Sequence, residues 1–302
     1  MSPVAAWTES RQKNTSATPF PTSPLFAGGR PSTWHVMKRY VPFMKSDPVV
    51  NVVRLQGVIA SGGRGQALND AGLASVLEKA FKKGKPKAVA LQLNSPGGSP
   101  VQSSLIGARI RRLSEEHEVP VLAFVEDVAA SGGYWLAAAA DEIFVDASSV
   151  VGSIGVISAS FGFHELMARQ GIERRVHTAG KDKSMLDPFR PERAEDVERL
   201  KDLQLQIHGS FIDHVKARRG GKLAEDQDLF TGEIWVGQRS IDVGLADAVG
   251  HLVPVLKERY GKNIRTNIFG ARRSLFSRLG ARVLADGIDQ LNETALWARY
   301  GL

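Results

Sequence analysis

The sequence has 302 residues, of which 43% are hydrophobic, so it can bury a substantial core within one large domain. It contains no cysteine, which excludes disulfide bonds, a thiolate nucleophile and a cysteine-ligated zinc site. The net charge of +7 comes from the two ends: residues 1–45 hold six basic and one acidic residue, and residues 262–302 hold seven and three. Such ends can attract anionic lipid or nucleic acid. We favour solvated segments and expect no nucleic-acid partner.

Residues 1–47 are predicted to be a disordered polar leader and entry segment. Residues 1–33 are rich in Pro, Ser and Thr, a composition that does not offset the entropy of ordering. They lack the apolar stretch and cleavage site of a secretory signal. No apolar run approaches the roughly 18 residues of a transmembrane helix. The expected location is cytoplasmic, with association at a membrane surface as a further option.

Residues 48–260 are predicted to form the main domain, in which strands and helices alternate. Apolar, β-branched runs indicate strands, and a period of three to four residues indicates helices. Strands are expected at 49–58, 88–93, 119–125 and 142–145, and helices at 68–81, 102–116 and 132–140. This alternation is typical of α/β proteins with a mainly parallel sheet and crossover helices. Ligands of such folds gather at the carboxyl ends of the strands.

The second half of the chain is predicted to add one long helix and a basic tail. Apolar residues spaced by three or four predict a helix over 193–218. Residues 230–247 indicate a strand, a short helix and a turn. Residues 261–302 are a basic amphipathic C-terminal segment, for which we weigh peripheral contact with anionic membranes against packing on a neighbouring subunit.

A glycine-containing turn, Asn94-Ser95-Pro96-Gly97-Gly98, follows the strand predicted at 88–93. Glycines let backbone N–H groups approach a ligand, and such groups can form an oxyanion hole. A plain turn is the other interpretation of this segment. The segment alone does not separate the two.

Ser131 lies between a predicted strand and an alanine-rich helix, among the small residues Ala129, Ala130, Gly132 and Gly133. A serine at a helix N-terminus can serve as an N-cap. It can also be a nucleophile, because small neighbours leave its hydroxyl accessible and the helix dipole favours an anion. Both interpretations stay open from this segment.

A nucleophilic serine needs a base, and the histidines follow patterns of ordinary surface or packing residues. Lysine is the other candidate, provided that its amine is kept neutral. Lys181 and Lys183 lie in a loop before the apolar run Met185-Leu186-Asp187-Pro188-Phe189. Burial beside such a run can lower a lysine pKa by several units. Solvated lysines are the alternative.

Taken together in order, these segments resemble the signal peptide peptidase A family of serine proteases. The resemblance covers about residues 49–253 and includes the motifs 94–98, 130–134 and 151–156, and Lys183 five residues before Pro188. It implies that Ser131 is the nucleophile, Lys183 rather than Lys181 the general base, and Ser153 a serine that orients the lysine amine. Backbone N–H groups of Gly98 and Gly132 would form the oxyanion hole, and no metal or cofactor is needed.

The same resemblance implies a ClpP/crotonase-like α/β fold and a homo-oligomeric ring around an enclosed chamber. Its substrates would be unfolded or membrane-derived peptides, hydrolysed through an acyl-enzyme. The leader is polar and proline-rich where the family has a membrane anchor, which leaves action on signal-peptide remnants open. Two alternatives remain: a crotonase-type acyl-CoA enzyme, and a noncatalytic scaffold or membrane adaptor of the same fold.

Overall fold

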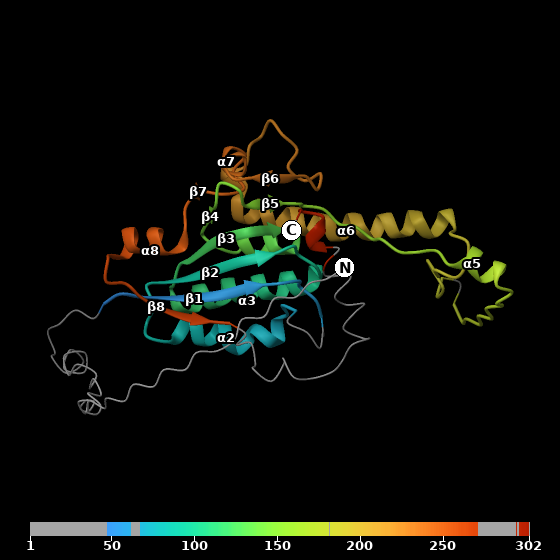
Figure 1. The fold of residues 1–302 in the computed structure, drawn as a ribbon, viewed down its shortest axis with the longest axis horizontal. Coiled ribbons are helices and arrows are strands. Elements are labelled where there is room, and N and C mark those ends of the chain that lie inside the picture. Colours follow the sequence, from blue (N-terminus) through green and yellow to red (C-terminus); the bar gives the residue numbers. More distant parts are fainter. Residues whose placement is uncertain (1–46, 62–66, 181, 271–293, 295, 302) are drawn as a thin grey trace, which may run out of the picture. The chain divides into compact units, whose positions relative to one another are not determined.

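The computed structural model of the chain describes residues 47–61, 67–180, 182–270, 294 and 296–301 (Figure 1). The expected leader lies outside the described residues, apart from Asp47, and so do Lys181 and most of the glycine-rich loop after the first strand. Most of the basic C-terminal segment, residues 271–293, also lies outside them.

The described residues form one mainly parallel sheet of eight strands in the order β6-β5-β3-β2-β1-β8, with β4 beside β3 and β7 beside β4. The antiparallel pairing in it joins β5 to β6. The strands are β1 (Val49–Gln56), β2 (Ala88–Ser95), β3 (Val121–Ala130), β4 (Glu142–Val145), β5 (Val150–Gly152), β6 (Ile234–Val236), β7 (Ala248–Val249) and β8 (Arg265–Phe269). The predicted α/β class with a mainly parallel sheet is confirmed.

The described helices are α2 (Asp70–Lys82), α3 (Pro100–His117), α4 (Gly132–Ala138), α5 (His164–Arg169), α6 (Ala194–Arg219), α7 (Gln238–Asp242) and α8 (Leu252–Tyr260), with a short 3-10 turn over Gly220–Lys222. All of them lie close to their predicted positions except α5 and α8, for which the sequence patterns predict no helix. Residues 174–177, whose pattern is strand-like, form no strand. They have no pairing partner in the sheet, and a strand is stable only when its backbone is paired.

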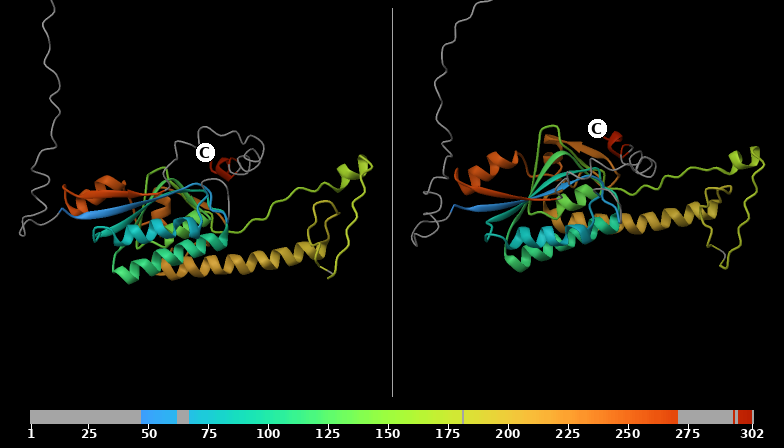
Figure 2. Two further views of the ribbon diagram at one scale, coloured as in Figure 1. Left: turned by 90° about the horizontal axis from the view of Figure 1, so that it is seen from below. Right: turned by 60° about the horizontal axis from the view of Figure 1, so that its bottom comes forward.

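The two faces of the sheet carry different layers (Figure 2). Because side chains alternate along a strand, Val53 and Leu55 of β1 point into the core under α2, α3 and α4, while Val50 and Val52 point to the opposite face. There Leu256 of α8 covers them. The main core therefore lies between the sheet and the helices α2, α3, α4 and α6.

The side chains on the face covered by α8 change from apolar to polar along the strands. Its amino-terminal half is apolar, whereas its carboxyl-terminal half carries Gln56, Gln92, Asn94 and Glu126, which hydrogen-bond to one another or to the neighbouring Asp127. Polar side chains at this end do not attract an apolar helix, so this part of the sheet stays open among the described residues.

The buried apolar residues of the long helix α6 lie in its C-terminal half. Phe211 and Val215 lie in the core, whereas Leu203 and Leu205, nearer the amino end, are 43% and 67% exposed. The predicted apolar stripe therefore exists, but one chain covers only part of it.

The sheet continues beyond residue 260, the expected end of the main domain. Residues 265–269, where the sequence pattern indicates an amphipathic segment, form β8 and pair in parallel with β1. The pairing matches Val49 with Arg265 and Val53 with Phe269. Within the described part of the chain, no helix combines the length and apolarity needed to span a bilayer.

Candidate functional site

Three strand ends meet where the sequence predicts the site. The strand β3 lies between β2 and β5 and runs parallel to both, so their carboxyl ends share one edge. The glycine turn follows β2, Ser131 follows β3, and Ser153 follows β5. The fold thus brings together three segments that are separate in the sequence.

Ser131 adopts a strained backbone conformation at the start of α4. Its φ of 51° and ψ of −123° lie in a region that non-glycine residues rarely adopt, and such strain clusters at functional sites. Its backbone N–H donates to the carbonyl of Gly152 at 2.8 Å. Ser131 occupies the N-cap position of α4, but its side chain makes no capping hydrogen bond. The hydroxyl is not used to stabilise the helix.

The glycine turn packs directly against Ser131. A Cβ built on Gly97 would lie 2.8 Å from the Cβ of Ser131, and one on Gly132 would lie 3.4 Å from the backbone nitrogen of Gly98. A side chain at Gly97 would therefore collide with the serine. Gly132 is the first residue of α4, so its N–H has no acceptor within the helix. Gly98 and Gly132 thus lie close to each other beside Ser131.

Ser153 also has a left-handed backbone, with φ 52°. Its N–H donates to the carbonyl of Glu233 at 2.7 Å, and the hydroxyl of Tyr300 donates to its Oγ at 3.4 Å. Its exposed fraction is 9%. Ser153 is linked to Ser131 through the preceding residue, Gly152, whose carbonyl accepts the hydrogen bond from Ser131 N–H.

A small pocket of about 20 Å³ lies beside Ser131. Such a volume holds about one water molecule, so a substrate side chain requires its walls to move apart. The walls are mostly apolar and come from the glycine turn, α4, the segment after Ser153 and α6. They are Gly98, Pro100, Ser131, Gly132, Trp135, Gly155, Val156, Ile207 and Phe211.

Two histidines of α6 hold this helix against the site. The Nε2 atom of His208 lies 3.0 Å from the carbonyl oxygen of Ile154, and that of His214 lies 3.0 Å from the carbonyl oxygen of Trp135. The ring of His214 also stacks on Trp135, and burial lowers the pKa of His214. These histidines bind backbone carbonyls, which agrees with a packing role rather than that of a catalytic base.

Lys183 is not brought to Ser131 within one chain. It is exposed, and the neighbouring Asp182 pairs with Arg199 at 2.8 Å, near the amino end of α6. Ile207, which lines the serine pocket, lies about 12 Å farther along the same helix at 1.5 Å per residue. No interaction among the described residues joins Lys183 to Ser131. The expected desolvation by the Met185–Phe189 run is likewise not supplied within one chain.

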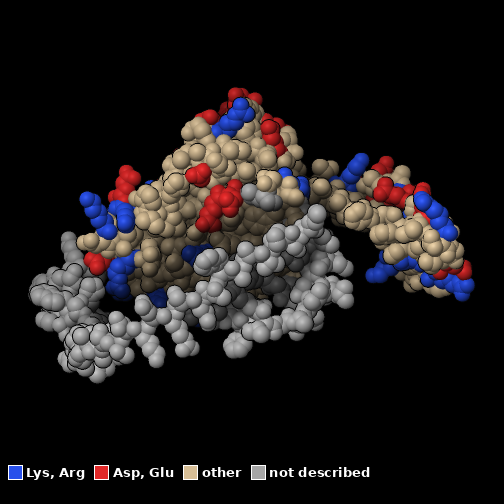
Figure 3. Space-filling view, viewed as in Figure 1, with Lys and Arg blue, Asp and Glu red and all other residues tan. Residues whose placement is uncertain are grey.

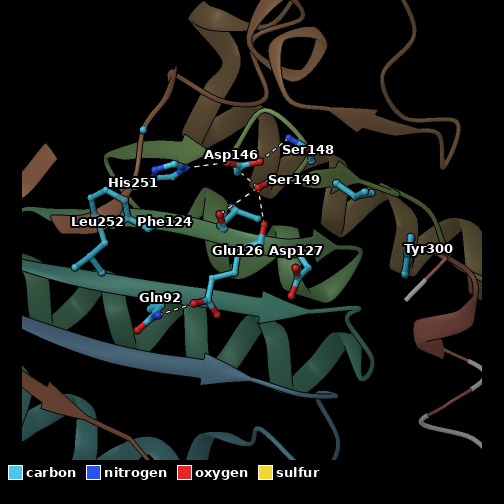
Figure 4. A pocket seen from close by; sticks show the side chains of 13 residues that line it. Gln92, Phe124, Glu126, Asp127, Asp146, Ser148, Ser149, His251, Leu252 and Tyr300 are labelled. Carbon is cyan, nitrogen blue, oxygen red and sulfur yellow. Dashed lines mark hydrogen bonds and ion pairs between the residues drawn. The ribbon is translucent and has the colours of Figure 1, made fainter. Parts of the chain in front are cut away.

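A second and larger pocket of about 490 Å³ lies on the open part of the sheet (Figure 4). Figure 3 shows acidic side chains gathered in a hollow near the centre of this face. Glu126, Asp127 and Asp146 line the pocket, together with His251 and Tyr300. Its position is distinct from that of Ser131, but Tyr300 borders both the pocket and Ser153.

The carboxylates of this pocket have neutral or histidine partners. Glu126 accepts hydrogen bonds from the amides of Gln56 at 2.8 Å and Gln92 at 2.5 Å. Asp146 lies 2.8 Å from His251, and this hydrogen bond lowers the pKa of Asp146. No local sequence pattern indicates this pocket, because its residues come from separate segments that include β2, β3, the loop after β4 and the start of α8. Among the described residues, no three His, Asp or Glu side chains are arranged to hold a metal.

Comparison with known proteins places this site in a family. Residues 114–260 match the sequence profile of peptidase family S49, a range that includes Ser131, Ser153 and Lys183. A Synechocystis protein with a provisional protease name is 30% identical over 66% of this chain and 68% of its own length. The chloroplastic serine protease SPPA of Arabidopsis thaliana is 31% identical over 67% of this chain and 29% of its own length.

A relative with higher sequence identity to this chain is named as a transporter and not as a protease. A Brucella melitensis protein named Na(+)/H(+) antiporter NhaA is 49% identical over 88% of this chain. The chain spans 39% of that protein's length.

Proposed function

Because the chain belongs to peptidase family S49, we propose that it is a serine endopeptidase with Ser131 as its nucleophile. The geometry around Ser131 carries this proposal. Ser131 has a strained backbone, and its hydroxyl makes no capping hydrogen bond. The backbone nitrogens of Gly98 and Gly132 lie nearby and can supply an oxyanion hole. Strain at a nucleophile is commonly tolerated because it presents the side chain to substrate. The antiporter name of the Brucella relative is not transferred, since this chain spans 39% of that protein.

In the proposed reaction, the neutral amine of Lys183 removes the proton from Ser131 Oγ, and the oxygen attacks the carbonyl carbon of a peptide bond. The N–H groups of Gly98 and Gly132 stabilise the resulting oxyanion. The lysine then gives its proton to the departing amine, leaving an acyl-enzyme on Ser131. Water hydrolyses this ester, with Lys183 again acting as the base. Ser153 would accept or donate a hydrogen bond that orients the lysine amine.

We infer that Lys183 reaches Ser131 of a neighbouring copy in a ring. Its loop is tied to the amino end of α6, about 12 Å from the serine pocket of its own chain, which a lysine side chain does not bridge. Between them α6 exposes Leu203 and Leu205, apolar surface that a second copy would cover. The same contact would exclude water from Lys183 and so favour its neutral form.

Unfolded or membrane-derived peptides are the proposed substrates. The pocket beside Ser131 is narrow and lined by Trp135, Ile207 and Phe211, which suits a small apolar side chain once the walls separate.

Hydrolysis of an unstructured protein and of a library of fluorogenic apolar peptides tests the proposal directly. We expect the wild type to cleave, Ser131→Ala and Lys183→Ala to lose at least about 10³-fold in kcat, and Lys181→Ala to keep most activity. Lys181→Ala is the matched control, because it removes a lysine from the same loop. Full activity of Ser131→Ala would overturn the proposal.

Mixing the two inactive variants tests where the lysine comes from. When Ser131→Ala and Lys183→Ala chains are co-expressed and purified as one complex, some contacts join an intact serine to an intact lysine of the other chain. We expect these complexes to regain activity. If assembled mixtures stay inactive, Lys183 acts within its own chain and the ring contact is not part of the site.

Acyl-CoA chemistry on the same fold is the competing function. It predicts turnover of acyl-CoA thioesters that survives Lys183→Ala, because no lysine base is needed there. Absence of both activities from an assembled wild type would instead favour a noncatalytic scaffold.

A further inference from the structure

We propose that His208 is a positioning residue that fixes the turn carrying Ser153 and, with it, one wall of the pocket beside Ser131. This inference rests on the proposed function, because it assigns His208 a task in presenting Ser153. It concerns a residue outside the predicted dyad and outside the predicted oxyanion hole.

The turn at Ser153 needs external support. A left-handed conformation at a serine costs free energy and persists only where the surroundings hold it. Three hydrogen bonds hold the backbone of this turn: Ser153 N–H to the Glu233 carbonyl at 2.7 Å, Gly155 N–H to the Ser153 carbonyl at 2.9 Å, and His208 Nε2 to the Ile154 carbonyl at 3.0 Å. Two of the three are made by the backbone alone, and the bond from Tyr300 reaches only the side chain of Ser153. His208 therefore supplies the side-chain hydrogen bond to the backbone of the turn, and a substitution of His208 can loosen it.

The His208 bond also sets the distance between α6 and the segment that follows Ser153. Ile207 and Phe211 of α6 face Gly155 and Val156 across the pocket beside Ser131. Ile154, whose carbonyl accepts the bond, is fully buried and immediately precedes this wall. One hydrogen bond thus links the position of Ser153 to the width of the pocket.

The bond needs a hydrogen on Nε2, which the neutral Nε2–H tautomer and the imidazolium both carry. A carbonyl oxygen accepts but does not donate, so Nε2 of His208 must carry a hydrogen. A glutamine places an amide N–H at a similar distance from the backbone, whereas a leucine fills the space without a donor. His208→Gln and His208→Leu therefore separate the hydrogen bond from the packing.

His214 provides a matched control on the same helix. It makes the same kind of bond, from Nε2 to the carbonyl of Trp135 at 3.0 Å, but that carbonyl lies in α4 and not in the Ser153 turn. If the histidines only dock α6 on the core, His214→Leu and His208→Leu should have equal effects on the Ser153 turn.

Amide hydrogen exchange followed by mass spectrometry tests the inference without any need for activity. In the intact protein, we expect His208→Leu to speed exchange at residues 150–156 at least about tenfold, as loss of one buried hydrogen bond implies. His208→Gln should exchange as the wild type does, and His214→Leu should leave this peptide unchanged. Unchanged exchange in His208→Leu, or an equal increase in His214→Leu, would overturn the proposal.

Kinetics then test whether the turn matters for the reaction. We expect kcat to fall about tenfold in His208→Leu and to recover in His208→Gln. In a Ser153→Ala background, His208→Leu should cause a smaller loss of kcat, because the part of its effect that passes through Ser153 is already absent. An undiminished loss in that background would show a general structural role. Failure of the proposed function has a different signature, namely an active Ser131→Ala enzyme.

Discussion

Single residues decide how closely the segments around Ser131 pack. Gly133, in the first turn of α4, lies so close to β2 that a Cβ would stand 2.4 Å from the carbonyl oxygen of Ser95. The obstacle is backbone, which does not rotate away as a flexible side chain can. The absence of a side chain at this glycine therefore sets the approach of α4, and of the preceding Ser131, to the sheet.

Gly133→Ala is predicted to destabilise the fold by about 1–3 kcal/mol, because α4 must move away from β2. Thermal unfolding should show a Tm lower by several degrees. Gly209→Ala in α6 is the control: nothing lies within 4 Å of its Cβ position, so alanine should raise stability by about 1 kcal/mol. Equal and small effects of both substitutions would contradict the close packing at Gly133.

At the scale of elements, an ion pair joins two of the helices that cover the main core. Asp70 at the start of α2 accepts two hydrogen bonds at 2.7 Å from Arg109 of α3. The hydrogen bond from Arg109 holds the pKa of Asp70 below its ordinary value of 3.8. Because the pKa of Asp70 is lower in the folded than in the unfolded protein, the ion pair contributes its full stabilisation above about pH 4. This contribution is lost as the pH falls through the folded pKa.

Asp70→Asn should therefore cost about 1 kcal/mol at neutral pH, and this cost should shrink below pH 4. Urea unfolding of both proteins between pH 7 and pH 3 measures the difference. Asp202→Asn on the exposed part of α6 serves as the control, since its partner is the neutral Gln206. A cost that stays constant down to pH 3 would mean that the carboxylate charge does not matter.

At the scale of the whole molecule, one chain carries the parts of the proposed site without joining them. Ser131, Gly98, Gly132 and Ser153 meet at one edge of the sheet, while the loop with Lys183 is held at the amino end of α6. The exposed leucines of α6 lie between the two. Proteolysis by a dyad shared between copies would require assembly, and activity would then depend on protein concentration.

Leu205→Glu is predicted to weaken assembly and activity together, because it places a charge on apolar surface that a second copy would cover. Sedimentation velocity should show a smaller species than the wild type, with unchanged circular dichroism. Gln204→Glu, a neighbouring charge change, is the control. A Leu205→Glu protein that assembles and cleaves normally would exclude this face of α6 as the contact.

Much of this architecture follows from local patterns. The β-branched runs and the three-to-four-residue periods predict β1, β2, α3 and α6 because burial on one face selects residues at the spacing of each element. Ser131 and the glycine turn also stand out locally, since small residues between a strand and a helix leave room for a substrate. The family resemblance, carried by motifs in order, adds Ser153 and Lys183, whose roles no local pattern could assign.

Contacts between distant segments were decided only by the tertiary structure. Residues 265–269 read locally as part of a basic amphipathic segment, yet they form β8, because the edge of β1 offers backbone hydrogen bonds and Asn267 binds Asn51 across 216 residues. The acidic pocket, the bond from His208 to Ile154, and the separation of Lys183 from Ser131 arise in the same way. Sequence periodicity reports which face of an element is buried, whereas the partner that buries it is chosen by the packing of the whole chain.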